Sequence, residues 1–205
     1  MMTNQSEFVR PVPLDRVYRI LNIGPTVIVS GKTENDFDAM AAAWNTALDL
    51  DPAKAVVILD KSHYTRKLIE ESNYFMLSIP TRSIAPQTLF LGSVSKNDEP
   101  EKIDQSGIRF LKDVEGLPDD IDLIEGCAAW ILFERIPEPH NEAAYDLFIG
   151  QAVGAWADER VFKDGRWMFE EVPQALQTIH YVAAGSTRSA TRSTSNKVRA
   201  ALSFR

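Results

Sequence analysis

The segment from Asp60 to Lys67 combines hydroxyls and cations at the point where an expected strand, Ala55–Leu59, gives way to an expected helix. It contains Ser62 and Thr65, three residues apart, and the cations Lys61, Arg66 and Lys67. Free backbone N–H groups at a helix start, with hydroxyls and cations beside them, suit an anionic phosphate. A serine in front of a helix is also a common N-cap. The residues alone therefore leave two interpretations open, an anion site and a helix cap.

A second run of residues, upstream of that segment, changes abruptly from small side chains to a large one. It consists of Met40, Ala41, Ala42, Ala43 and Trp44. A flat ring could lie against the backbone of such a run, beside the Trp44 indole. We interpret this run and the 60–67 segment as the two ends of one flavin mononucleotide (FMN) site.

Several other kinds of catalytic or metal site are not indicated. The sequence lacks the GxGxxG, GxxxxGK[ST], HExxH, CxxC and GxSxG motifs. The three histidines, His63, His140 and His180, lie far apart, and none stands at metal-ligand spacing from another. We therefore expect no metal site. Cys127, the only cysteine, precedes an apolar run, which favours a buried structural thiol over a reactive one.

Composition favours one domain in a cytoplasmic, soluble protein. With 205 residues and 44% hydrophobic composition, the chain can bury one sizeable core. A net charge of −7 argues against a nucleic-acid surface, which is usually basic. The sequence shows no basic-then-apolar leader and no apolar run near the roughly 20 residues of a membrane span, so we expect no membrane partner. A single cysteine fits a reducing compartment.

The C-terminal stretch has the opposite charge from the rest of the chain. No Asp or Glu follows Glu171, and the cations there are Arg188, Arg192, Lys197, Arg199 and Arg205. We expect residues 186–205 to be a basic, Ser/Thr-rich, disordered tail, with contact to anionic partners as the alternative.

The sequence predicts many strands and few helices, and these elements must position residues 40–44 and 60–67. Strands are expected over 26–30, 38–44, 55–59, 74–79, 121–123, 127–136 and 144–156, and helices over 13–21, 65–72 and 100–107. The Asp164-Gly165 pair between aromatic flanks predicts a tight turn. Because strands and helices do not alternate regularly, we predict a closed antiparallel barrel with helices packed outside.

These segments together resemble the flavin reductase-like family, the flavoredoxin group of FMN-binding split-barrel proteins. The residues that carry the resemblance are 21–27, Met40 to Trp44, Lys61 to Ile69, 124–128, 145–150 and 162–167. The likeness covers Pro13 to Tyr181, and it implies one domain over residues 12–185. The implied fold is mainly β, an FMN-binding split β-barrel of Greek-key type with a few peripheral helices.

The resemblance also implies roles for individual residues. Met40 to Trp44 would line the isoalloxazine ring. Lys61, Ser62, His63 and Thr65 would surround the ribityl phosphate, and Ser95 and Lys96 match a second loop near the flavin. Family members dimerise with the cofactor at the subunit interface, so the resemblance implies a homodimer.

The function implied is an oxidoreductase that passes electrons from NAD(P)H through FMN to free flavin, ferric iron or another acceptor. Because the flavin supplies the chemistry, no catalytic side chain is assigned, and His140 and His180 are only candidates for contact with the donor. The chain departs from the family pattern at 143–145 and 183–188, where a nicotinamide would dock. A flavin- or haem-binding carrier or sensor without turnover therefore remains the alternative.

Overall fold

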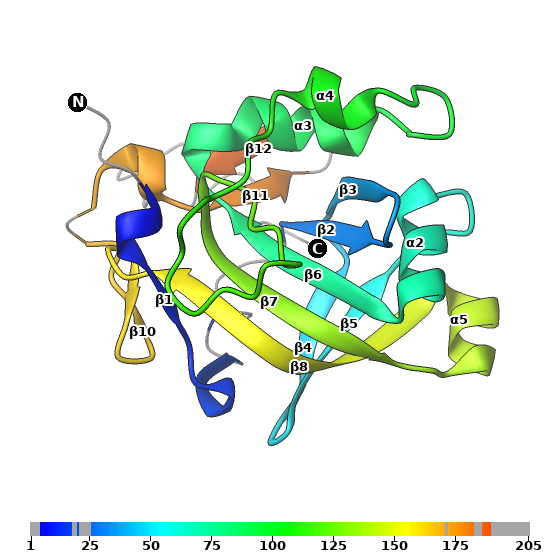
Figure 1. Ribbon diagram of the computed structural model, residues 1–205, viewed down its shortest axis with the longest axis horizontal. Helices are drawn as coiled ribbons and strands as arrows, with labels where there is room; N and C mark the ends of the chain where they lie inside the picture. The colour runs from blue at the N-terminus through cyan, green and yellow to red at the C-terminus, as the bar shows by residue number, and fades with distance from the viewer. Residues whose placement is uncertain (1–4, 18–19, 21–25, 171, 183–185, 190–205) are drawn as a thin grey trace, which may run out of the picture.

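A computed structural model describes residues 5–17, 20, 26–170, 172–182 and 186–189 of the chain. Its centre is an eight-stranded antiparallel sheet with the order β3-β2-β6-β7-β8-β5-β4, and β1 pairs with β8 (Figure 1). The strands are β1 (Val9–Pro11), β2 (Val27–Lys32), β3 (Phe37–Ala42), β4 (Asn45–Leu50), β5 (Ala53–Ile58), β6 (Tyr74–Pro80), β7 (Cys127–Ile136) and β8 (Leu147–Asp158). The mainly β prediction is confirmed.

The sheet curls around one apolar core and leaves its two end strands unpaired with each other. β3 and β4 end the strand order, although only Ala43 and Trp44 separate them in the sequence. The predicted closed barrel is therefore split along this line. Inward positions such as Val57, Leu77 and Phe133 are fully buried, as expected for strands whose side chains alternate between two faces.

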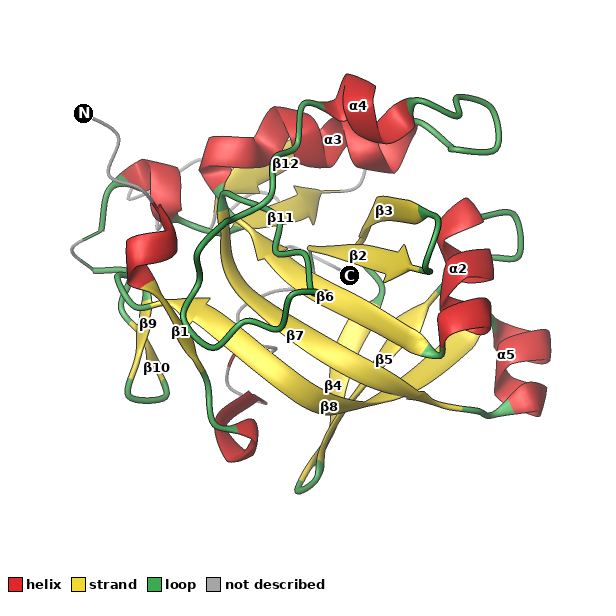
Figure 2. Ribbon diagram, viewed as in Figure 1, coloured by secondary structure: helices red, strands yellow, loops and turns green. Residues whose placement is uncertain are grey.

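The helices lie at the periphery of the sheet (Figure 2). They are α2 (Tyr64–Ser72), α3 (Ala85–Ser93), α4 (Lys102–Ser106) and α5 (Pro139–Tyr145), with 3-10 turns at Gln5–Phe8, Leu14–Arg16, Arg82–Ile84 and Gln174–Leu176. α2 packs on β2 at Gly31, where an added Cβ would lie 2.9 Å from the Ile69 side chain. This close approach fixes where the first turn of α2 lies beside β3.

Several expected elements differ from the structure. The expected strand 144–156 begins only at Leu147, because α5 occupies 139–145 and ends at Asp146 with a φ of 54°. The expected 38–44 strand corresponds to β3, which ends at Ala42, and β4 was not expected. No strand covers 121–123, where only a Phe110–Ile124 bridge forms. Part of the expected 13–21 helix lies outside the described residues, and its described start is a 3-10 turn.

Other expectations are confirmed. β7 has the predicted bounds, β6 and α2 agree within one residue, and α4 ends at Gly107 with a φ of 68°. A hairpin joins β9 (Phe162–Lys163) to β10 (Arg166–Trp167) through Asp164 and Gly165, both at positive φ. Cys127 is buried, and burial raises the pKa of its thiol far above the ordinary value.

The C-terminal part described is a hairpin. β11 (Ile179–Val182) pairs antiparallel with β12 (Ser186–Ser189), so the expectation of a disordered tail is wrong for these first four residues. The expected boundary after Gly185 falls inside this hairpin, and residues 190–205 lie outside the described part. Among the described helices, none combines the length and apolar character that crossing a bilayer requires.

Candidate cofactor-binding site

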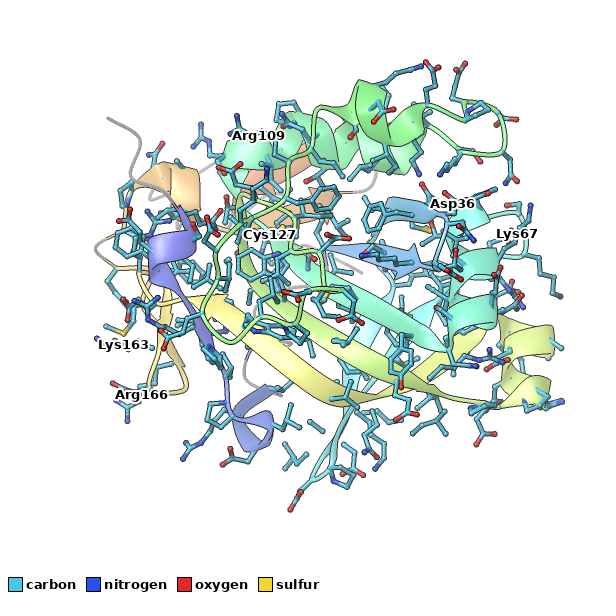
Figure 3. The ribbon with its side chains drawn as sticks, viewed as in Figure 1. Asp36, Lys67, Arg109, Cys127, Lys163 and Arg166 are labelled. Atoms are coloured by element: carbon cyan, nitrogen blue, oxygen red, sulfur yellow. The ribbon has the colours of Figure 1, made fainter. Side chains whose placement is uncertain are left out.

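A cavity of about 240 Å³ lies where β3, the start of α2 and the loop after α3 meet. Six of the predicted site residues line it: Met40, Ala41, His63, Thr65, Ser95 and Lys96. Three segments far apart in the sequence thus converge on one place. Figure 3 shows Asp36 and Lys67 on this side of the molecule, near α2.

The other five predicted site residues lie outside this cavity; they are Ala42, Ala43, Trp44, Lys61 and Ser62. The Trp44 side chain is 74% exposed. Lys61 Nζ donates to the Ala143 carbonyl oxygen at 2.7 Å, and Ser62 Oγ donates to Asp60 Oδ1 at 2.7 Å. The Lys61 and Ser62 side chains therefore hydrogen-bond to other protein groups and do not line the cavity.

The start of α2 keeps its N–H groups available. His63 is the N-cap residue, and no described side chain caps the helix. Asp60 instead accepts hydrogen bonds from the Ser62 hydroxyl and backbone, and these lower the pKa of its carboxyl. His63 Nδ1 is buried and has no hydrogen-bond partner in the described part of the chain, which is unusual because buried polar atoms are nearly always paired. A ligand in this cavity could accept hydrogen bonds from the first N–H groups of α2 and form one with His63 Nδ1.

A buried polar group forms the floor of the cavity. Asp38 is 1% exposed, Thr65 1% and Lys102 2%. Thr65 Oγ1 donates to Asp38 Oδ2 at 2.6 Å, and Lys102 Nζ lies 3.1 Å from Asp38 Oδ1, an ion pair without hydrogen-bond geometry. An ammonium has three donors, so Lys102 retains donors for a ligand in the cavity it lines. The arrangement ties the first turn of α2 to α4.

A second polar group, centred on Asp36, joins the start of α2 to the loop after α3. Tyr64 OH donates to Asp36 Oδ2 at 2.6 Å, and Lys96 Nζ donates to Asp36 and to the Phe37 carbonyl oxygen. Lys67 and Lys96 lie over the Tyr64 ring at 5.2 and 5.4 Å from its centroid. Burial opposes ionisation of Asp36, but the hydrogen bonds from Lys96 and Tyr64 outweigh it and lower the pKa of its carboxyl. The hydrogen bond to Asp36 raises the pKa of Tyr64.

Sequence reasoning missed Asp36, Asp38, Tyr64 and Lys102. A charged residue inside an expected strand was the available signal for Asp38. α4 is too short for a periodic pattern to show that Lys102 faces inward. The cavity is therefore lined by more fixed charge than the predicted residues alone would supply.

Most of the chain matches a known protein family. The model of the flavin reductase like domain family matches residues 19–181. An uncharacterized protein, YddH, of Escherichia coli (strain K12) is 37% identical over 180 residues, covering 86% of this chain and 92% of that protein.

Solved structures share the fold. The FMN-binding domain of a flavin reductases-like enzyme from Shewanella baltica OS155 is 38% identical with a TM-score of 0.84, covering 91% of this chain and 96% of that one. Flavoredoxin of Desulfovibrio vulgaris (Miyazaki F) is 20% identical with a TM-score of 0.66, covering 87% and 92%. At that identity the likeness to flavoredoxin concerns the fold alone. The family model and the two closer relatives show that this chain belongs to the flavin reductase-like family.

Proposed function

We propose that this protein binds FMN in the cavity at the start of α2 and is an oxidoreductase. Electrons would pass from NAD(P)H through the flavin to free flavin, ferric iron or another acceptor. The observation that carries the proposal is a cavity with free α2 N–H groups, an unpartnered His63 Nδ1 and the cations Lys96 and Lys102. The 38% identical Shewanella structure, which is an FMN-binding domain, supports the same cofactor.

The residues of the cavity fit the parts of FMN. The free N–H groups of α2 and His63 would hold the phosphate, because a helix start and a buried nitrogen both favour an anion or acceptor. Met40 and Ala41 would lie against the ring, and Lys102 would donate to its oxygens. The flavin, when bound, accepts and donates the electrons. Fixed cations near the ring would stabilise negative charge that develops on it.

We further propose that the functional unit is a homodimer whose second subunit completes the site. A cavity of about 240 Å³ is small beside the ~300–1,000 Å³ of typical ligand sites. Trp44 is 74% exposed, and the β4–β5 hairpin, which extends from the barrel in Figure 1, exposes Leu48 and Leu50. Trp44 follows β3, which lines the cavity, and the exposed apolar side chains of Trp44 and of this arm are suited to pack on a second copy.

The test of function is the colour and reactivity of the purified protein. We expect a yellow protein, or one that becomes yellow with added FMN, whose flavin absorbance bleaches promptly when NADH or NADPH is added without oxygen. A colourless protein that takes up no FMN would contradict the whole proposal. A cytoplasmic setting is also proposed, on the acidic composition and the single, buried Cys127.

A flavin or haem carrier without turnover is the second candidate. The observation in its favour is local: residues 143–145, which depart from the pattern of NADH-using members, form the end of α5. There Ala143 O accepts a hydrogen bond from Lys61, and the Tyr145 side chain is 62% exposed. A bound flavin that dithionite reduces and neither nicotinamide reduces would favour this candidate.

A further inference from the structure

A second and larger cavity lies on the outer face of β2, β6 and β7. Its volume is about 550 Å³, and it shares no lining residue with the cofactor cavity. The loop that follows α4 crosses in front of β6 and β7 in Figure 1, and residues 120–122 of this loop form one wall. Lys32 Nζ fixes that wall by donating to the Asp120 carbonyl oxygen at 2.8 Å and to Asp122 Oδ2 at 2.7 Å.

The inner surface of this cavity is apolar. Met76, which is 5% exposed, lines it together with Leu132 and Phe37, whereas the Phe75 ring is stacked on Phe133 in the core inside the barrel. The Phe37 ring is held edge-to-face against Phe110, with 5.2 Å between centroids. A well-formed apolar cavity with a few polar groups is the usual form of a small-molecule site.

The rim of the cavity is negatively charged. Lys32, its one basic lining residue among those described, is already engaged by Asp122. The carboxylates of Glu34, Glu71 and Asp120 also line the cavity, and none of them has an ion-pair partner in the described part of the chain. Three unpaired carboxylates at one rim attract a cation and repel an anion.

A serine of low exposure also lines this cavity. Ser30 lies on β2, is 5% exposed and lines the cavity, and its side chain has no hydrogen-bond partner among the described residues. A hydroxyl in a cavity wall that no described protein group engages keeps a donor and an acceptor for a ligand atom. This observation is independent of the charge at the rim.

We propose that this second cavity binds an organic cation with an apolar body, such as an arylalkyl ammonium compound. Its ammonium group lies among Glu34, Glu71 and Asp120, and its apolar part lies on Phe37, Met76 and Leu132. A polar substituent reaches Ser30. The proposal does not depend on FMN binding, because the two cavities are lined by different residues.

The test uses three probes of nearly equal size: 2-phenylethylammonium chloride, neutral 2-phenylethanol and anionic phenylacetate. Each is titrated calorimetrically into the full-length protein with excess FMN present, so that the flavin cavity is not available to the probe. We expect the ammonium compound to bind at least tenfold more tightly than the alcohol, and phenylacetate more weakly than both. Equal affinities for the ammonium compound and the alcohol would overturn the proposal.

Two matched variants locate the binding. Glu34→Gln/Glu71→Gln removes two rim charges and should weaken binding of the ammonium compound about tenfold or more. Binding of the alcohol should change less than about twofold. Glu7→Gln/Glu115→Gln removes the same charge from exposed positions that do not line the cavity and should leave both affinities unchanged. Equal losses in the two variants would show that net charge alone attracts the probe, which refutes the site. Ser30→Ala should weaken a probe with a hydroxyl on its ring and leave the unsubstituted probe unchanged.

Discussion

The two cavities flank the same β2–β3 hairpin but differ in charge. At the start of α2, the cations Lys96 and Lys102 and the first N–H groups of a helix surround a cavity of about 240 Å³. On the outer face of β2, acidic residues that have no ion-pair partner among the described residues line a cavity of about 550 Å³. An acidic chain, with a net charge of −7, thus places two lysines at this cavity, each paired with an aspartate.

The difference lies in how each charge is held. Lys102 and Asp38 are almost fully buried and paired with each other, whereas Glu34 and Glu71 are exposed and form no ion pair within the described residues. Buried charges hold a fixed geometry at a high cost in desolvation, and exposed ones are screened by water and salt. We therefore expect a fixed ligand pose in the first cavity and selection of ligands by charge in the second.

Removing one partner of the buried pair should have the largest effect. Lys102→Met leaves Asp38 buried and uncompensated, and we expect the free energy of unfolding to fall by roughly 3–5 kcal/mol in chemical denaturation. The double variant Asp38→Leu/Lys102→Met should recover most of this loss. A single-variant loss below about 1 kcal/mol would show that Asp38 is not held as a buried charge.

Charging the exposed arm should weaken the proposed dimer by less. Leu48→Lys/Leu50→Lys replaces two apolar side chains, so we expect dimerisation to weaken by roughly 2–3 kcal/mol, measured by sedimentation at a series of concentrations. FMN should be released together with the monomer, since a ligand that binds both subunits stabilises the dimer. Leu89→Lys, at an exposed leucine on α3, is the control and should have no effect.

The phosphate end of the first cavity can be tested through His63. We expect His63→Leu to weaken the binding of FMN by roughly 1–2 kcal/mol, because one hydrogen bond to a charged group is lost. Riboflavin, which has no phosphate, should bind the variant and the parent protein alike in fluorescence titrations. His140→Leu, on α5 outside the cavity, is the matched control. Parallel losses for FMN and riboflavin would mean that His63 does not contact the phosphate.

The smallest effect concerns Asp36, which lies between the two cavities. Its carboxyl has a pKa below the ordinary value of 3.8, because hydrogen bonds from Lys96 and Tyr64 outweigh the opposing effect of burial. A lowered folded-state pKa contributes stability that is present above pH 3.8 and is lost as the pH falls toward the folded value. Because this group is partly exposed, we expect less than about 1 kcal/mol. Asp36→Asn should make the free energy of unfolding depend less steeply on pH in this acidic range. An unchanged dependence on pH would contradict the lowered pKa of Asp36.

Local patterns in the sequence were sufficient for much of the fold. The apolar run Cys127–Ile136 predicted β7 with its bounds, and Asp164-Gly165 predicted the β9–β10 turn. Where two patterns adjoin without a break, sequence reasoning failed. Ala143, Ala144 and Tyr145 continue the apolar character of β8, but they belong to α5, which ends where Asp146 adopts a left-handed conformation and binds Arg66 at 2.6 Å.

The sequence by itself determined that hydroxyls and cations stand at a helix start, and that small residues precede Trp44. Only the tertiary structure decided which of them share a cavity. Thr65 donates to Asp38 and Ser62 to Asp60, partners that no spacing rule predicts for them. Lys102 reaches the same floor from α4, far along the chain. Strand periodicity depends on neighbours in sequence, whereas the charge of a cavity depends on which distant side chains are buried together, and packing alone determines that.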